Sequence, residues 1–338
     1  MRDERNYNLL KHNTFGIEAC CQRFLEYSNL NEAVAVARLL REEPQPFMMT
    51  GAGSNLLLTR DYAGTMVHSA IKGFSLTEQP DGQATLRCGS GETWDDIVAW
   101  TAEQGFFDLV NLSLIPGEAG ASAVQNIGAY GTEAEQSIES IQAVDLTTET
   151  VIRIAKEECH YGYRDSRFKH EWRNRFLITH VNYMLNRRSQ PNTAYGNIRA
   201  ELERLGISSP TPLQLRQAII GIRRAKLPDP QELGNAGSFF VNPIVSRQQF
   251  EALAAQYPQM PHYYINETQE KIPAGWLIEQ CGWKGRSMGR AGVYEKQALV
   301  LVNLGGATGQ EIADLCHAIQ EDVQRKFGVA IKPEVNLI

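Results

Sequence analysis

The sequence lacks long apolar runs, an excess of basic charge and an apolar leader segment, and each absence excludes a class of protein. The longest apolar stretches, such as 298–302, have the length of a strand, whereas a membrane span needs about 20 residues. Lys and Arg number 33 against 39 Asp and Glu, and this net charge of −6 argues against a general nucleic-acid binder. The first ten residues show no secretory signal, so we expect a cytoplasmic protein.

Signals for metals, disulfides and oligomers are also missing. The six cysteines form no C-x-x-C pair, and we expect reduced thiols that are buried as small apolar side chains. Cys159 and Cys316 each precede a His, but two adjacent side chains do not build a tetrahedral metal site, so we expect no metal. No long heptad pattern is present, which favours a monomer. The acidic net charge and the lack of long apolar runs predict that neither nucleic acid nor a membrane is a partner.

The composition is that of an ordinary globular protein: of the 338 residues, 43% are hydrophobic and 21% are charged. At roughly 100–200 residues per domain, this length predicts two or three domains. Residues 1–70 and 231–328 each mix helical and strand-like patterns and are interpreted as small α/β units. The Pro-containing break at 227–230 is interpreted as a domain boundary.

Capping residues followed by apolar periodicity predict five helices. Their expected N-caps are Asn31, Thr93, Thr211, Ser246 and Thr308. Gly105 is expected to end the second of these helices and Gly328 the last. Short strands are expected at 47–49, 56–58, 141–146, 176–181 and 298–302, and the last ten residues, 329–338, are strand-like.

Two segments rich in small residues are candidates for a ligand site. Gly51-Ala52-Gly53-Ser54-Asn55 forms either a nest of backbone N–H groups for a pyrophosphate or an ordinary tight turn. Leu56 breaks the Rossmann fingerprint, and no P-loop lysine follows. Residues 117–131 either pack a helix closely on a sheet or offer a backbone surface to a large flat ligand. In the second case the polar groups would come from Ser122, Gln125 and Asn126. Together the two segments favour a dinucleotide held between two domains.

Three further segments contain side chains capable of chemistry. Arg164 either pairs with Asp165 on the surface or forms an anion clamp, because a guanidinium suits a carboxylate. Ser238 follows a glycine, which is typical of a turn, and it does not lie in a G-x-S-x-G motif, which weakens a hydrolase interpretation of this segment. Glu334 lies on the strand-like C-terminal segment, where a lone Glu is more often a surface residue than a catalytic one.

Several stretches, taken in order along the chain, resemble the UDP-N-acetylenolpyruvoylglucosamine reductase family. They are 13–16, 51–57, 114–131, 161–166, 234–243, 273–279 and 332–335. The resemblance spans nearly the whole chain and implies an α+β fold. An FAD-binding fold of the vanillyl-alcohol oxidase/PCMH type would occupy two N-terminal domains, 1–70 and 71–227, and a C-terminal α/β domain, 228–328, would bind a UDP-sugar. The strand 329–338 would return to the first domain.

The resemblance also implies an activity. NADPH would reduce non-covalently bound FAD, which would then reduce the enolpyruvyl ether of UDP-N-acetylglucosamine to UDP-N-acetylmuramate for peptidoglycan synthesis. Arg164 would stabilise the developing enolate, Ser238 would protonate it, and Glu334 would position or stabilise the intermediate.

The implied binding residues fall into two sets. FAD would be bound by Gly51, Ala52, Gly53, Ser54, Asn55, Pro116, Gly117, Gly120, Ser122, Gln125, Asn126, Gly128 and Arg223. The UDP-sugar would be bound by Tyr195, Lys226, Asn242, Tyr263, Lys284 and Gln297. Residues 190–199 are similar to a loop whose Tyr folds over the substrate. Two alternatives stay open: a flavin oxidoreductase of the same fold with another substrate, and a UDP-sugar-binding protein that has lost its flavin.

Overall fold

The computed structural model describes residues 1–338, and the chain divides into two compact units. Unit 1 consists of Met1–Tyr7, Cys21–Ala52 and Ala63–Arg223, and unit 2 of Asn8–Cys20, Gly53–Tyr62 and Arg224–Ile338. Each unit therefore combines segments that are far apart in sequence. All six cysteines are free thiols; four are buried as expected, whereas Cys20 and Cys281 are partly exposed. None of the helices combines the length and the apolar character that crossing a bilayer would take.

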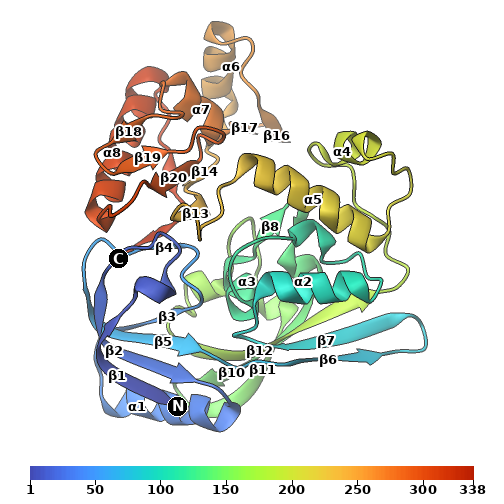
Figure 1. The fold of residues 1–338 in the computed structure, drawn as a ribbon, viewed down its shortest axis with the longest axis vertical. Coiled ribbons are helices and arrows are strands. Elements are labelled where there is room, and N and C mark those ends of the chain that lie inside the picture. The colour runs from blue at the N-terminus through green and yellow to red at the C-terminus, as the bar shows by residue number, and fades with distance from the viewer. The chain divides into compact units, whose positions relative to one another are not determined.

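Two sheets form the frame of unit 1 (Figure 1). The four-stranded sheet has the order β1 (Arg2–Asn8), β2 (Cys20–Tyr27), β5 (Tyr62–Ser69), β3 (Phe47–Thr50), and β3 runs parallel to β5. The five-stranded sheet is antiparallel throughout, with the order β11 (Thr150–Ala155), β10 (Ile138–Asp145), β12 (Phe176–Asn186), β7 (Gln83–Gly89), β6 (Phe74–Glu78). On β12, buried Val181, Tyr183 and Leu185 alternate with half-buried residues, the period of a strand with one well-covered face.

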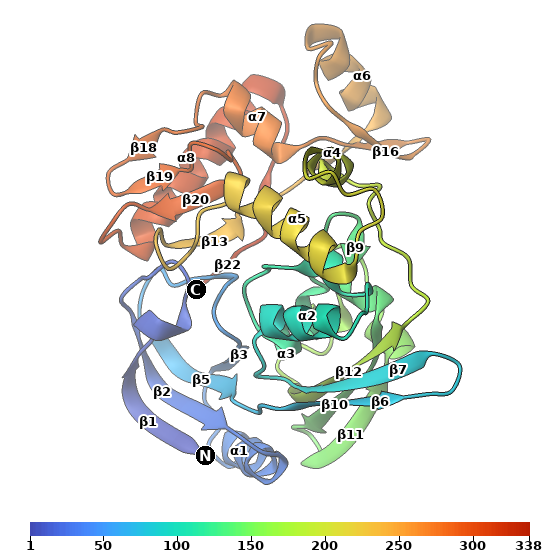
Figure 2. The ribbon, with the colours of Figure 1, turned by 45° about the vertical axis from the view of Figure 1, so that its right-hand side comes forward.

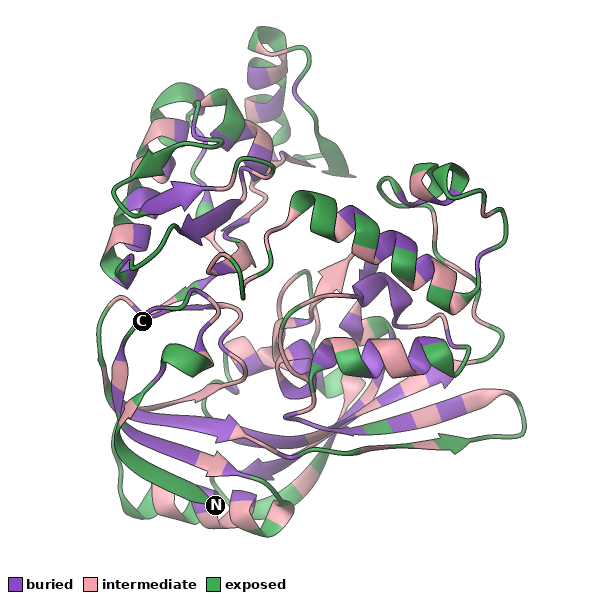
Figure 3. Ribbon diagram, in the orientation of Figure 1, coloured by how far each residue is buried: buried purple, intermediate pink, exposed green.

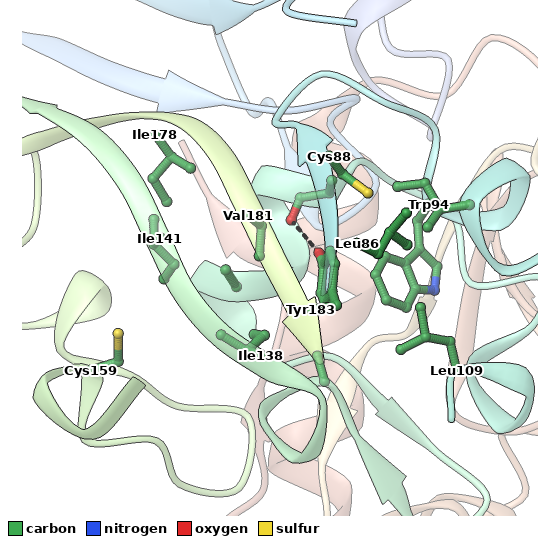
Figure 4. Close-up of a cluster of buried hydrophobic side chains, with 14 of the residues drawn as sticks. Leu86, Cys88, Trp94, Leu109, Ile138, Ile141, Cys159, Ile178, Val181 and Tyr183 are labelled. Carbon is green, nitrogen blue, oxygen red and sulfur yellow. Dashed lines mark hydrogen bonds between the residues drawn. The ribbon is translucent and has the colours of Figure 1, made fainter. Parts of the chain in front are cut away.

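Helices α2 (Trp94–Glu103) and α3 (Ala119–Gln125) share the largest core of unit 1 with β7, β10 and β12. The rings of Trp94 and Tyr183 meet edge to face at 5.7 Å within this core (Figure 4). The Trp94 indole N–H donates to the Leu112 carbonyl at 2.9 Å, so its only polar group is satisfied. This packing fixes α2 and α3 against the sheet; α3 is itself part of the small-residue segment, and the Trp94 backbone N–H at the start of α2 donates to the Gly117 carbonyl.

Helix α1 (Leu30–Glu42) packs its buried residues, such as Val36, against Leu25 and Leu177 of the two sheets. Asn29 is its N-cap, and the Asn29 side chain accepts from the Glu32 N–H at 3.0 Å. The prediction of Asn31 as the cap was wrong, because the helix begins at Leu30 and Asn31 already lies in its first turn.

Helices α4 (Ile198–Arg204) and α5 (Pro212–Lys226) bury their apolar faces together with Ala102 and Val110. The expected cap at Thr211 is confirmed: Thr211 Oγ1 accepts from the Gln214 N–H at 3.3 Å, and Gln214 Oε1 accepts from the Thr211 N–H at 2.9 Å. Thr93 precedes α2 as expected, although its side chain makes no capping hydrogen bond. Short 3-10 helices occur at Leu10–His12, Val110–Leu112, Ala134–Gln136, Lys156–Cys159 and Arg167–Lys169.

In unit 2, helices α7 (Ala274–Gln280) and α8 (Gly309–Phe327) lie beside a four-stranded sheet (Figure 2). Its order is β13 (Asn235–Ser238), β20 (Val300–Asn303), β19 (Ala291–Val293), β18 (Ser287–Met288). Strands β19 and β20 are buried (Figure 3). The expected capping box of Thr308 and Glu311 begins α8, and Gly328 ends it at φ +64°.

Smaller pairings complete unit 2. Strands β15 (Ile244–Ser246), β17 (Gln269–Lys271) and β16 (Tyr263–Asn266) form a sheet beside α6 (Arg247–Gln256), which Ser246 caps as expected. Strand β14 (Phe240–Val241) pairs with β21 (Lys332–Pro333), and β22 (Asn336–Leu337) runs parallel to β4 (Leu56–Leu57). The end of the chain is therefore two short strands. Glu334 lies on the bend between them and not on a strand, which corrects the expectation.

Candidate active site

The glycine segment 51–55 connects β3 to β4, and close backbone approaches demand its small residues. Gly53 has φ +68°, and a Cβ there would lie 2.0 Å from the His12 carbonyl oxygen. A Cβ at Gly51 would lie 3.1 Å from Oε2 of Glu118, the N-cap residue of α3. Gly53 is buried, whereas the other four residues of the segment are partly accessible and can present their backbone to a ligand.

A partly buried charge cluster, which the sequence did not reveal, holds Glu118 beside this segment. The His68 imidazole on β5 lies between two carboxylates, with Nδ1 2.8 Å from Glu26 Oε2 and Nε2 3.1 Å from Glu118 Oε1. Burial by itself would lower the pKa of His68, but the hydrogen bonds and charges of Glu118 and Glu26 outweigh it and raise the pKa above its usual value. No spacing in the sequence connects these three residues, so only the fold could show the cluster.

The segment 117–131 forms α3 and the strand β8 (Gly128–Ala129), which pairs with the following strand β9 (Thr132–Glu133). Gly120 permits close packing, because a Cβ there would lie 2.9 Å from Cβ of Ser90. Ser122 is 1% exposed and its hydroxyl meets the Tyr183 hydroxyl at 2.8 Å, while Asn126 is 0% exposed and its Nδ2 donates to the Gly162 carbonyl at 2.8 Å. Both side chains therefore form hydrogen bonds within the protein, and their assignment to a ligand site stays a prediction.

What remains accessible in this segment is mostly backbone and small side chains. Pro116 is exposed, and Gly117, Ala121, Gln125 and Gly128 are partly exposed. The structure therefore fits both interpretations of 117–131. Its buried residues pack α3 on the sheet, and its accessible residues have small side chains that leave the backbone open to a flat ligand.

Arg164 lies against this surface. It has φ +56°, and its guanidinium donates to the Asn126 carbonyl at 3.3 Å and to the Gly128 carbonyl. The neighbouring Asp165 accepts from His170 Nε2 at 2.8 Å. The guanidinium of Arg164 therefore lies beside β8, where an anion clamp needs a cation. Asp165 pairs with His170 and not with Arg164.

Arg223 on α5 is a second cation of unit 1 and is largely desolvated. Its Nη2 donates to the Leu114 carbonyl at 3.2 Å, whereas its Nε is buried without a hydrogen-bond partner. Burial lowers the pKa of Arg223 from its usual value, the nearby charge of Arg164 acts in the same direction, and Tyr130 and Asp95 oppose them. A buried N–H without a partner costs about 1–3 kcal/mol. A bound ligand with an acceptor at this position would remove that cost, so the site fits a polar cofactor.

Tyr195 is 50% exposed and is carried by a loop that side chains attach to the rest of unit 1. Asn111 Nδ2 donates at 3.0 Å to the carbonyls of both Tyr130 and Asn192. A Cβ at Gly131 would lie 3.2 Å from Cβ of Tyr195, so the loop passes directly over this glycine.

Ser238 in unit 2 is exposed at the end of β13, and an irregularity in the strand presents it. Asn235 pairs with Val302 and Ser238 with Val300, so the register shifts between them. Gly237 has φ +68° and donates its N–H to the Asn235 side chain at 2.9 Å. Such a bulge redirects the side chain that follows it, and here that side chain is Ser238.

The backbone of Glu334 forms hydrogen bonds with both of the other expected segments of unit 2, the one that contains Ser238 and the end of the glycine segment. Its N–H donates to the Phe239 carbonyl at 2.8 Å, and its carbonyl accepts from Asn55 Nδ2 at 3.3 Å. Asn55 and Glu334 are 279 residues apart in sequence. The structure therefore brings Ser238, Glu334 and the end of the glycine segment to one place.

The residues expected to bind the UDP-sugar have diverse environments. Asn242 accepts from the Ala274 N–H at 2.9 Å at the start of α7, and Gln297 Oε1 accepts from the Leu299 N–H at 3.3 Å, so both have structural contacts. Lys284 pairs with Glu279 at 3.0 Å. Lys226 and Tyr263 are exposed. Of the whole expected site, Arg164, Arg223 and Tyr195 belong to unit 1, whereas Ser238, Glu334 and these five residues belong to unit 2.

Comparison with known proteins gives matches along the chain. A family model described as the C-terminal domain of UDP-N-acetylenolpyruvoylglucosamine reductase matches residues 229–338, and a model described as an FAD binding domain matches residues 22–155. A UDP-N-acetylenolpyruvoylglucosamine reductase of Bacteroides fragilis (strain YCH46) is 48% identical over 99% of this chain and 100% of its own length. Those of Flavobacterium johnsoniae and Burkholderia ambifaria (strain AMMD) are each 44% identical, covering 100% and 97% of this chain and 100% and 95% of their own lengths.

A solved structure shows the same fold. The crystal structure of UDP-N-acetylenolpyruvylglucosamine reductase from Thermus caldophilus aligns with 100% of this chain and 99% of its own, with a TM-score of 0.68 and 21% sequence identity. The expected fold class, an FAD-binding fold followed by a C-terminal α/β domain, is confirmed.

Proposed function

This chain belongs to the UDP-N-acetylenolpyruvoylglucosamine reductase family, and from this we infer that it reduces the enolpyruvyl ether of UDP-N-acetylglucosamine to UDP-N-acetylmuramate. The observation that carries the inference is identity of 48% over the whole length of a named reductase. The chain is a flavin-dependent oxidoreductase of peptidoglycan precursor synthesis that uses NADPH as hydride donor and binds FAD.

The chain's own residues would supply binding, charge stabilisation and a proton. FAD, when bound, supplies the carrier that takes hydride from NADPH and gives it to the alkene carbon of the substrate. Arg164 would bind the substrate carboxylate and stabilise the negative charge that develops beside it, because its guanidinium is already oriented by the carbonyls of Asn126 and Gly128. Ser238 would protonate the resulting enolate carbon, and Glu334 would position or stabilise that intermediate.

The FAD contacts would come mainly from backbone. We assign them to 51–55, to Pro116, Gly117, Gly120, Gln125 and Gly128, and to Arg223, whose buried Nε has no partner in the protein. Ser122 and Asn126 would contribute by shaping α3 and the turn after it, since their side chains are bonded internally.

The UDP-sugar is a small-molecule partner, and we propose which residues contact it. We assign them to Tyr195, Lys226, Asn242, Tyr263, Lys284 and Gln297. Tyr195, Lys226 and Tyr263 are supported by their exposure, and Lys226 suits a diphosphate as a flexible point charge. We also retain the division into FAD-binding domains at 1–70 (joined by 329–338) and 71–227 and a substrate domain at 228–328, and we propose a cytoplasmic monomer.

An anaerobic absorbance experiment tests the function and separates the alternatives. The purified protein should be yellow, NADPH should bleach it, and the enolpyruvyl UDP-sugar should restore the colour. Bleaching without recovery on this substrate would favour a flavin oxidoreductase with another substrate. A colourless protein that binds UDP-sugar but not added FAD would favour a binding protein.

A further inference from the structure

Asp95 on α2 binds two partners at once, one on the backbone and one on another helix. Its Oδ1 accepts from the Leu114 N–H at 2.5 Å. Arg216 on α5 grips both carboxylate oxygens, with Nη1 to Oδ1 at 2.7 Å and Nη2 to Oδ2 at 2.9 Å. The Arg216 side chain is 12% exposed and that of Asp95 25%, so the pair is largely shielded from water. Shielded bidentate pairs of this kind are strong and have a defined geometry.

Leu114 has a backbone conformation that needs such support. Its φ of +58° lies in the left-handed region, which is rare for a residue with a branched side chain. Such a conformation is strained and persists only where the surroundings enforce it. Asp95 holds the Leu114 N–H on one side, and Arg223 Nη2 donates to the Leu114 carbonyl on the other at 3.2 Å.

Arg216 and Arg223 are seven residues apart on α5, about two helical turns, and therefore share a face. Asp95 pairs directly with Arg216, and its charge also favours the protonated form of Arg223. The contacts thus run from Arg216 through Asp95 and the Leu114 peptide to Arg223, whose buried Nε remains without a partner.

We propose that Asp95 is a positioning residue for the FAD site: together with Arg216 it fixes the Leu114 turn and thereby aims the Arg223 guanidinium at bound FAD. The proposal rests on the proposed function, because the acceptor for Arg223 Nε is taken to be the flavin. Leu114 directly precedes the 115–117 segment, so the same contact sets the start of the small-residue surface.

A double-mutant cycle on FAD affinity tests the proposal. The FAD dissociation constant of reconstituted protein is measured from flavin fluorescence for wild type, Asp95→Ala, Arg223→Ala and the double variant. We expect each single change to weaken FAD binding by about tenfold or more, roughly 1.4 kcal/mol. The double variant should be little weaker than Arg223→Ala alone, because Asp95 acts through Arg223. Additive losses, or an Asp95→Ala variant with wild-type affinity, would overturn the proposal.

Two further variants control for folding and charge. Asp95→Asn keeps an acceptor for the Leu114 N–H but loses the charged grip on Arg216, so its loss should be smaller than that of Asp95→Ala. Asp96→Asn removes a neighbouring charge from the exposed face of α2 and should bind FAD normally. An equal loss in Asp96→Asn would make the effect one of net charge and reject the proposal. A wild-type protein that binds no FAD would instead reject the proposed function itself.

Discussion

At the scale of single residues, Ser238 is exposed because one glycine breaks the register of β13. Gly237 at φ +68° allows the bulge, and the fully buried Phe239 follows directly. The buried Phe239 ring anchors the backbone next to Ser238, while the irregularity in the strand leaves the Ser238 side chain exposed.

We predict that Ser238→Ala separates the two half-reactions. FAD binding and flavin reduction by NADPH should be nearly normal, because the proton is needed only after hydride transfer to the substrate. Reoxidation by the enolpyruvyl substrate should slow by about 10²–10⁴-fold, the usual contribution of a positioned general acid. Stopped-flow absorbance measures both rates. Equal small effects on both would mean that Ser238 is only a turn residue.

Arg164 is held by backbone carbonyls, and this geometry depends on the planar guanidinium. We predict that Arg164→Lys lowers turnover by about 10²-fold although the charge is kept, since Lys cannot bridge two acceptors and grip a carboxylate bidentately. Steady-state kinetics check this, with the exposed Arg173→Lys as the matched control. Turnover that survives the change, with only a small loss of stability, would leave Arg164 as a structural residue.

At the scale of secondary-structure elements, the charge cluster of Glu26, His68 and Glu118 joins β2, β5 and the N-cap of α3. Both ring nitrogens of His68 face carboxylates, so the protonated imidazole can donate to both and the neutral one to only one. The element that borders the glycine segment is therefore held most firmly when His68 is charged.

The charge cluster should make the unfolding free energy depend on pH. Because the pKa of folded His68 is raised above 6.5, its contribution is fully present below pH 6.5 and is lost as the pH rises through the raised value. We predict that His68→Gln removes this decline from the unfolding free energy above pH 6.5, measured by urea titration at several pH values. The exposed His317→Gln should leave the decline in place. An unchanged pH profile in His68→Gln would exclude the cluster as its source.

At the scale of the whole molecule, the chain passes repeatedly between its two units. Residues 8–20 and 53–62 belong to unit 2 although they lie within the first 70 residues, and the terminal strand β22 pairs with β4. The expected catalytic residues are divided in the same way, with Arg164 in unit 1 and Ser238 and Glu334 in unit 2.

We predict that the Tyr195 loop becomes ordered when the substrate binds. Asn111 anchors Asn192, so exchange should change most in the residues that follow, 193–197, where Tyr195 is half exposed. Hydrogen exchange with and without the UDP-sugar measures this, and the buried strand β20 serves as an internal reference. Equal protection of the loop in both states would mean that it does not close over the substrate.

The sequence by itself determined what local interactions decide. The caps at Thr211, Ser246 and Thr308 and the stop at Gly328 were predictable because a capping bond spans only three or four residues. The small-residue segments and the ordered motifs were enough to indicate the family. The Asn31 cap failed because Asn29 was also available two positions earlier, and local chemistry could not choose between them.

Only the tertiary structure decided which partners the polar side chains have. Ser122 and Asn126 look polar and available in sequence, but the fold buries both and satisfies them with partners such as Tyr183 and the Gly162 carbonyl. Glu334 reaches Asn55 across 279 residues, and Asp95 reaches Arg216 across 121. Contacts at such separations arise from sheet pairing and helix packing, which depend on the whole chain, so no local pattern could have specified them.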